Sequence, residues 1–213
     1  PTPGPSPTPT NTPIPPTPTD TATATATATP TNTPLPPTAT ATPTTTPTPT
    51  NTPVVTGFTL TPVADARVLQ VNPDTNYGTA TRLDVDSPGE NSYIRFTVSG
   101  VTGAVQNATL RLFATNGSSD GPSLYATEDS WTELGITWNN RPGPTSGALA
   151  DVVDVTAGFW VEYDLSGYIT GDGTYSFVFL PDSSNGVTFE SRETASPPEL
   201  VLSFASGPTP TPT

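Results

Sequence analysis

The sequence predicts an all-β protein: a jelly-roll-like antiparallel β-sandwich preceded by an extended, polyproline-II-like Thr/Pro stalk. Two observations lead to this prediction. Between residues 57 and 206, short runs of alternating apolar and polar residues are separated by turn sequences such as SPGEN, GDG and DSSNG. Residues 1–53, in contrast, contain 17 Pro and 22 Thr, no aromatic residue and a single charged residue, Asp20. We therefore divide the chain into a stalk (1–56), a folded domain (57–206) and the start of a second Thr/Pro-rich linker (207–213).

The stalk has almost no apolar side chains to bury, so it cannot offset the entropy of folding into a core. Proline fixes its own φ and favours extended conformations in the residue before it, which favours polyproline II. The phrase PTNTPIPPT at 9–17 returns at 30–38 and, shortened, at 49–56. Its hydroxyls predict O-glycosylation, as in other Ser/Thr-rich and Pro-rich stalks. The candidate sites are Thr10, Thr12, Thr17, Thr19, Thr31, Thr33, Thr38, Thr48, Thr50 and Thr52.

Period-two alternation in the domain identifies short strands with one buried face each. In residues 92–98, for example, Ile94, Phe96 and Val98 share one face while Arg95 lies on the other. The only helical feature that we expect is one short turn at 165–171. Many short strands with regular turns predict two packed sheets. The expected strands are Ala66–Val71, Arg82–Asp86, Ser92–Val98, Thr109–Ala114, Ser123–Thr127, Asp151–Val155, Trp160–Leu165, Tyr175–Leu180, Val187–Glu190 and Leu200–Phe204.

Composition excludes several classes of function. The chain has no Cys, His, Met or Lys, its six basic residues are all Arg, and its net charge is −13. This charge argues against binding to nucleic acid or to an anionic membrane surface, and no apolar run approaches the about 20 residues of a membrane helix. Without His and Cys, the feasible catalytic group is a carboxylate pair. Among so many acids some close pair arises by chance, so we predict no enzyme activity and no catalytic residues.

Four phrases of the domain resemble a known family: ADARVLQVNPDTNYGTATRLDVD, YIRFTVSGVTGAVQNATLRLFA, DSWTELGITWNNRPG and GVTFESRETASPPELVL. Their order and spacing are similar to the DNRLRE-domain group, which overlaps carbohydrate-binding module family 96. The resemblance covers about residues 58–204. It implies a non-catalytic β-sandwich module attached to a large secreted bacterial protein, in some members linked to binding acidic polysaccharides such as alginate. It also implies an extracellular or cell-surface location.

Exposed aromatic rings and one arginine are the candidates for contact with such a ligand, because aromatic faces stack on sugar rings and guanidinium pairs with carboxylate. Each has a structural alternative: the tryptophans as core residues, and Arg192, beside Glu193 in the SRE phrase, as an ion pair that fixes a loop. The absence of Lys and the scatter of six Arg fit a polyanion ligand poorly. The candidates are Tyr77, Tyr93, Tyr125, Trp131, Trp138 and Arg192.

The acidic residues also raise the possibility of structural calcium, which prefers carboxylate oxygens. No spacing typical of an EF-hand loop is present, so the ligands cannot be chosen from the sequence. We expect no other cofactor. The candidate ligands are Asp65, Asp84, Asp86 and Asp129, with Glu128 and Asp151 as further acids nearby.

The Thr/Pro-rich segments on both sides of the domain lead to the main functional interpretation. The chain starts at Pro1 and ends within GPTPTPT, so we expect a mature product or a piece of a longer polypeptide. The predicted function is a structural unit of a secreted, glycosylated surface protein, a fibre or tandem array in which copies of the sandwich contact one another. The alternative is a carbohydrate-binding module that a long spacer tethers to a secreted enzyme or to the cell envelope, with polysaccharide as its partner.

Overall fold

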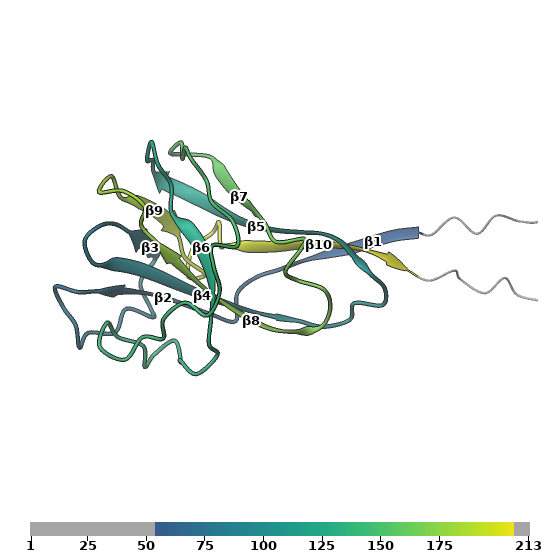
Figure 1. Cartoon of the computed structure of the whole chain (residues 1–213), viewed down its shortest axis with the longest axis horizontal. Helices are drawn as coiled ribbons and strands as arrows, with labels where there is room; N and C mark the ends of the chain where they lie inside the picture. Colours follow the sequence, from purple (N-terminus) through teal and green to yellow (C-terminus); the bar gives the residue numbers. More distant parts are fainter. Residues whose placement is uncertain (1–53, 207–213) are drawn as a thin grey trace, which may run out of the picture. The chain divides into compact units, whose positions relative to one another are not determined.

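The computed structural model of the chain describes residues 54–206. The stalk residues 1–53, with the ten candidate threonines, lie outside the described residues, as does the arm at 207–213. The described part contains ten strands (Figure 1). They are β1 (Val54–Leu60), β2 (Ala64–Leu69), β3 (Arg82–Val85), β4 (Glu90–Val98), β5 (Val105–Asn116), β6 (Ser123–Thr127), β7 (Trp160–Asp164), β8 (Gly173–Leu180), β9 (Val187–Glu190) and β10 (Glu199–Ser206).

The strands form two antiparallel sheets that enclose a common core, which confirms the predicted two-sheet sandwich. The larger sheet has the order β1-β10-β5-β9-β3, and β7 pairs with β5 beside this path. The smaller sheet has the order β2-β4-β8-β6. Every strand pair is antiparallel. Alternation places Leu110 and Leu112 of β5 in the core and Arg111 on the outer face, as the period-two pattern predicts.

The smaller sheet is buried on both faces, which the sequence pattern did not predict. Tyr93 of β4 points away from the main core, yet it is only 1% exposed. Residues of this outer face belong to a second apolar cluster, and the segment 128–145 covers the face with its own apolar side chains. Trp131 of that segment packs edge-to-face on Tyr93, with ring centroids 5.9 Å apart. The covering segment thus gives the sandwich a third layer made of irregular chain.

Strand β1 was missed by the sequence analysis, which assigned its first residues to the stalk. It pairs with β10 along all seven of its residues, from Val54 to Leu60. Phe58 packs edge-to-face on Phe204, with ring centroids 5.5 Å apart. Gly57 interrupts the alternation, and the structure shows why it is needed: a Cβ at this position would lie 2.3 Å from the carbonyl oxygen of Leu202. The close approach of β1 to β10 thus requires a glycine, and this glycine breaks the alternation of apolar and polar residues by which a strand is predicted.

The expected strand at 151–155 is wrong. Only Val155 makes a β-bridge there, exchanging two backbone hydrogen bonds with Ser118 at 2.8 and 2.9 Å. The segment is otherwise a loop: Val155 is buried in the main core and Val152 packs against it, while Val153 is 73% exposed. Apolar alternation therefore identified residues that reach the core, but a strand also needs a partner strand along its length.

The expected helical turn at 165–171 is present. The carbonyl of Leu165 accepts hydrogen bonds from the amides of Tyr168 and Ile169, both at 2.9 Å. Ile169 is fully buried, so the turn closes the core beside β7. Among residues 54–206, no helix has the length and apolar character to cross a membrane.

The cover over the smaller sheet should contribute much of the stability. We expect Trp131→Ala to lower the free energy of unfolding by about 3 to 5 kcal/mol, since it removes a large buried side chain and leaves a cavity. Phe159→Ala is the matched control: its ring is 65% exposed, so the loss should stay within about 0.5 kcal/mol. Urea denaturation of both variants measures the difference. Equal losses would contradict the assignment of Trp131 to a core.

Candidate functional site

Four of the six predicted ligand-binding residues, Tyr93, Tyr125, Trp131 and Trp138, lie on the outer side of the smaller sheet or in its cover. Two of them offer no face to a ligand: Tyr93 is 1% and Trp131 5% exposed. The hydroxyl of Tyr93 donates to the carbonyl of Pro142 at 2.7 Å, and burial raises the pKa of Tyr93 to about 12, although Arg141 acts in the opposite direction. The guanidinium of Arg95 lies 4.3 Å from the centre of the Trp131 ring and closes its other side.

The remaining aromatic candidates are half-buried. Tyr125 and Trp138 pack against the second apolar cluster. Tyr77 lies under the guanidinium of Arg67, 4.8 Å from the ring centre, and Trp138 lies under that of Arg141, 3.4 Å from its ring centre. Arginine therefore occupies one face of each of these two rings, which leaves only the opposite face for contact with a sugar.

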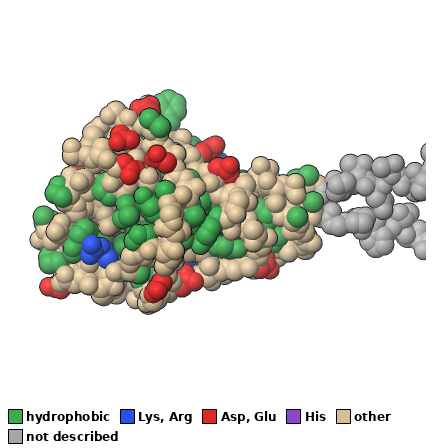
Figure 2. Space-filling view, in the orientation of Figure 1, with side chains coloured by type: hydrophobic (Ala, Val, Ile, Leu, Met, Phe, Trp, Pro, Cys, Tyr) green, Lys and Arg blue, Asp and Glu red, His purple; other side chains and the backbone are tan. Residues whose placement is uncertain are grey.

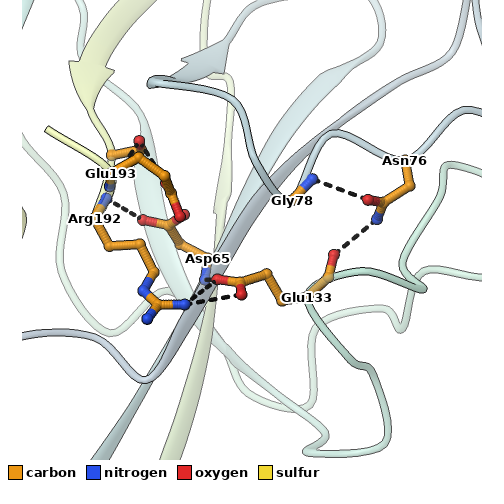
Figure 3. Close-up of polar contacts among 7 residues, drawn as sticks. Asp65, Asn76, Gly78, Glu133, Arg192 and Glu193 are labelled. Carbon is orange, nitrogen blue, oxygen red and sulfur yellow. Dashed lines mark hydrogen bonds and ion pairs between the residues drawn. The ribbon is translucent and has the colours of Figure 1, made fainter.

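The sixth candidate, Arg192, cross-links distant segments (Figure 3). Its Nη1 donates to both carboxylate oxygens of Glu133, at 2.7 and 2.8 Å, and its backbone amide donates to Oδ2 of Asp65 at 2.8 Å. Glu133 also accepts a hydrogen bond from the amide of Asp65 at 3.0 Å. These bonds tie β2, the covering segment 128–145 and the chain after β9 together. This geometry corresponds to the structural alternative for Arg192.

Asn76 completes the same junction, and the sequence analysis missed it. Its Nδ2 donates to the carbonyls of Glu133 and Ile136, both at 2.7 Å, while its Oδ1 accepts from the amide of Gly78 at 3.1 Å. A Cβ at Gly78 would lie 2.1 Å from the carbonyl oxygen of Glu133, so the two backbone segments are in close contact here (Figure 3). Three of the four family phrases contribute to this junction, and β2 opens the first of them. We call Asp65, Asn76, Glu133, Arg192 and Glu193 the junction cluster.

The structure does not bring the four candidate calcium ligands together. Asp65 lies in the junction cluster, where one carboxylate oxygen from each of Asp65, Glu133 and Glu193 lies within 4.8 Å of the others, so these three could hold a cation. Arg192 already supplies positive charge to this group. Calcium binding stays a prediction.

The other candidate calcium ligands lie elsewhere in the domain. Asp84 pairs with Arg67 and Arg82 and accepts from Thr188 at 2.9 Å. Asp129 faces Arg95 at 3.8 Å. Asp86 lines a small polar pocket of about 180 Å³ with Asp84 and Glu90. Burial, together with repulsion from Asp84 and Asp86, raises the pKa of Glu90, so this pocket already carries excess negative charge.

Asp65 has the most perturbed carboxyl in the junction cluster. Burial raises its pKa to about 7, and the nearby Glu193 and Glu133 add to the rise. The amide of Arg192 and its guanidinium act in the opposite direction without cancelling it. The folded protein can therefore hold a proton on Asp65 at a pH where an exposed aspartate would be ionised.

Arg141 differs from every other arginine in the chain. Ion pairs to carboxylates occupy Arg67, Arg82, Arg95, Arg111 and Arg192. Arg141 makes no ion pair with any of residues 54–206; it packs on Trp138 and donates to its carbonyl. It opens instead onto a pocket of about 350 Å³. The walls of this Arg141 pocket are Asn91, Tyr93, Arg141, Pro142, Gly143, Pro144 and Leu180.

A larger groove of about 500 Å³ follows β7 on the other sheet. Phe159, just before the strand, is 65% exposed, and acidic side chains flank it. On the visible face of the domain, acidic side chains are more widespread than basic ones (Figure 2). The β7 groove is lined by Val152, Asp154, Thr156, Phe159, Trp160, Val161 and Glu162.

Comparison with known proteins identifies the domain. The sequence pattern of carbohydrate-binding module family 96 matches residues 56–204. The chain belongs to this family. It is also 31% identical over 176 residues to a gellan lyase from a Bacillus species, an alignment that covers 74% of this chain and 7% of the relative.

Membership in family 96 confirms the resemblance seen in the four phrases and supports the alternative functional interpretation better than the fibre subunit. The family consists of binding modules, so the matched domain is a non-catalytic module and polysaccharide is the implied partner. Sequence reasoning missed Arg141 and Phe159. The signal for each is weak: an arginine with no acid nearby in NNRPG, and two adjacent aromatics after Gly158.

The junction cluster should make stability depend on pH. The unfolded chain releases the proton of Asp65 near its ordinary pKa of 3.8, whereas the folded protein keeps it to about pH 7. This group therefore makes the free energy of unfolding fall as the pH rises from about 4 to about 7, and the loss persists above. Asp65→Asn should remove that slope and stabilise the protein at pH 8 by about 1 to 3 kcal/mol.

Urea denaturation between pH 4 and pH 8 measures this effect. The exposed Asp182 provides the control, because Asp182→Asn makes the same chemical change at the surface and should alter the free energy of unfolding by no more than about 0.5 kcal/mol. If Asp65→Asn destabilises the protein equally at every pH, the carboxylate is ionised in the fold and needed there, and the assignment fails.

Proposed function

We propose that this domain binds an acidic polysaccharide, and that Arg141 contacts a carboxylate of the polymer. The observation that carries the proposal is the pairing state of the arginines: five of six are neutralised by acids, and Arg141, at an open pocket, is not. A guanidinium offers two parallel donors that match the two oxygens of a carboxylate. A carboxylate of the ligand would give Arg141 the acidic partner that the other five arginines find within the domain.

The surroundings of Arg141 favour such a contact. Its packing on the ring of Trp138 restricts the guanidinium before any ligand arrives, which lowers the entropy cost of binding. Pro142, Pro144 and Leu180 form an apolar wall, and Asn91 supplies an amide that can bond to sugar hydroxyls. A mostly fixed pocket with a few polar groups is typical of small-ligand sites.

The overall charge limits how the polymer binds. With a net charge of −13, the protein repels a polyanion at long range, so attraction has to come from the local contact. A broad basic platform is absent from residues 54–206, because their other arginines face acids of the same domain. The proposal is therefore a point contact to one sugar acid rather than a basic groove along the chain.

The setting of the domain is part of the proposal. The relative is named a gellan lyase, and only 7% of its length corresponds to this chain. We propose that this jelly-roll-like module, residues 57–206, likewise belongs to a larger secreted polysaccharide-degrading enzyme. The Thr/Pro segments 1–56 and 207–213 would then serve as extended spacers, with their threonine hydroxyls carrying O-linked sugars.

Substitution of Arg141 tests the proposal. We expect the full chain to be retarded in gels that contain gellan or alginate, and Arg141→Ala to lose at least tenfold in affinity, since a charge-assisted pair contributes roughly 1.5 to 3 kcal/mol. Arg141→Lys should keep part of the binding, because a lysine retains the charge but not the planar pair of donors. Affinity electrophoresis and calorimetry measure both.

Arg82→Ala is the matched control, since that side chain is 57% exposed and its partner Asp84 retains Arg67. It removes the same charge and should leave binding within about twofold. Equal losses for Arg82→Ala and Arg141→Ala would show that net charge alone decides binding, and the pocket would be rejected.

A further inference from the structure

We propose that the β7 groove is a second sugar-binding site, separate from the Arg141 pocket, and that it takes an uncharged pyranose unit. The inference goes beyond the proposed function, because it concerns a different sheet and a ligand of different charge. It depends on three features of the groove: an anchored exposed ring, a fixed aromatic wall, and two carboxylates at its sides.

The side chain of Phe159 is exposed to solvent, while backbone hydrogen bonds hold its main chain in place. The amide of Gly158 donates to the carbonyl of Ala114 at 2.7 Å, and the amide of Ala114 donates to the carbonyl of Phe159 at 3.0 Å. Gly158 has a φ of 85°, a conformation that side-chain-bearing residues rarely adopt. The turn and the two hydrogen bonds fix where the ring projects, and the ring remains 65% exposed.

Trp160 forms a fixed wall beside it. Its ring packs edge-to-face on Phe113, with centroids 5.6 Å apart, and the guanidinium of Arg111 lies 4.8 Å from its centre. Arg111 is itself held by Glu162 and Glu199, each at 3.2 Å. A wall held in this way needs little ordering when a ligand binds. The apolar C–H face of a pyranose packs on such aromatic surface.

The acids determine the charge of the ligand. Asp154 and Glu162 line the groove, and Asp154 makes no ion pair with any part of the chain from 54 to 206. Ionised carboxylates accept hydrogen bonds and donate none, so they suit hydroxyl groups. They repel a second carboxylate in the same space. An uncharged sugar satisfies both conditions, whereas a uronic acid does not.

The size and position of the groove agree with this assignment. Its volume of about 500 Å³ lies within the range of about 300 to 1,000 Å³ typical of small-ligand sites. It runs along β7, which pairs only with β5 among the described strands, so one side of β7 is open to a ligand. The Arg141 pocket instead opens beside β4 and β8 of the smaller sheet. The two sites can therefore be tested independently.

The test uses the full 213-residue chain with four variants and two classes of probe. The neutral probes are hexasaccharides of glucose, mannose, galactose and xylose; the acidic probe is an alginate hexasaccharide. We expect calorimetry to show binding of at least one neutral probe. Phe159→Ala should weaken that binding at least tenfold and leave alginate binding within twofold, and Arg141→Ala should do the reverse. Asp154→Asn, which keeps an acceptor oxygen, should cost less than Asp154→Ala.

Several results would overturn the inference. If wild-type protein binds none of the neutral probes, or if Phe159→Ala leaves their binding unchanged, the site is rejected. If Phe159→Ala instead converts an oligomer to a monomer in sedimentation without changing sugar binding, the groove is a contact between copies of the chain. Loss of alginate binding on Arg141→Ala, with no neutral binding, would retain the proposed function and reject only this second site.

Discussion

The burial of both faces of the smaller sheet is the constraint on which the rest of the domain depends. Tyr93 and Val178 point away from the main core, so they need an apolar cover. That cover is irregular chain, which lacks the backbone ladder of a third sheet, and it has to be held by side chains. The junction cluster does this through Arg192 and Glu133. The position of the cover therefore depends on a polar contact between segments 59 residues apart.

This constraint also decides which side chains remain for function. Trp131 is a binding candidate in the sequence, but it lies buried in the cover, where Arg95 packs on its ring and donates to its carbonyl. Arg192 is used in the same way. Ion pairs of this kind contribute little net stability when solvent reaches them, yet removing one partner of a buried pair is costly. Arg141 and Phe159 differ from these residues. The fold holds both in place, but Arg141 has no acidic partner among residues 54–206 and the ring of Phe159 is 65% exposed.

The sequence predicted the strands well where burial follows a period of two. In β5 and β10 the alternation was sufficient, because each has one face in a common core. It failed at β1, where Gly57 meets a neighbouring carbonyl, and at 151–155, where apolar residues reach the core but only Val155 makes a β-bridge. For the site, Asp65 and Arg192 were both singled out, but they are 127 residues apart and nothing local indicates their contact. Arg141 was missed because what distinguishes it is the lack of an acid near it in three dimensions.

The two candidate sites differ in charge, and this difference bears on the kind of polymer that suits the module. A homopolymer of uronic acid could use the Arg141 pocket but would be repelled at Asp154 and Glu162. A neutral homopolymer would leave the guanidinium without its ion pair. Only a polymer that contains both kinds of unit could engage both sites, and simultaneous contacts multiply affinity where the geometry allows it. Two weak contacts on different sheets would then select a mixed acidic and neutral chain, even though the acidic surface repels polyanions at long range.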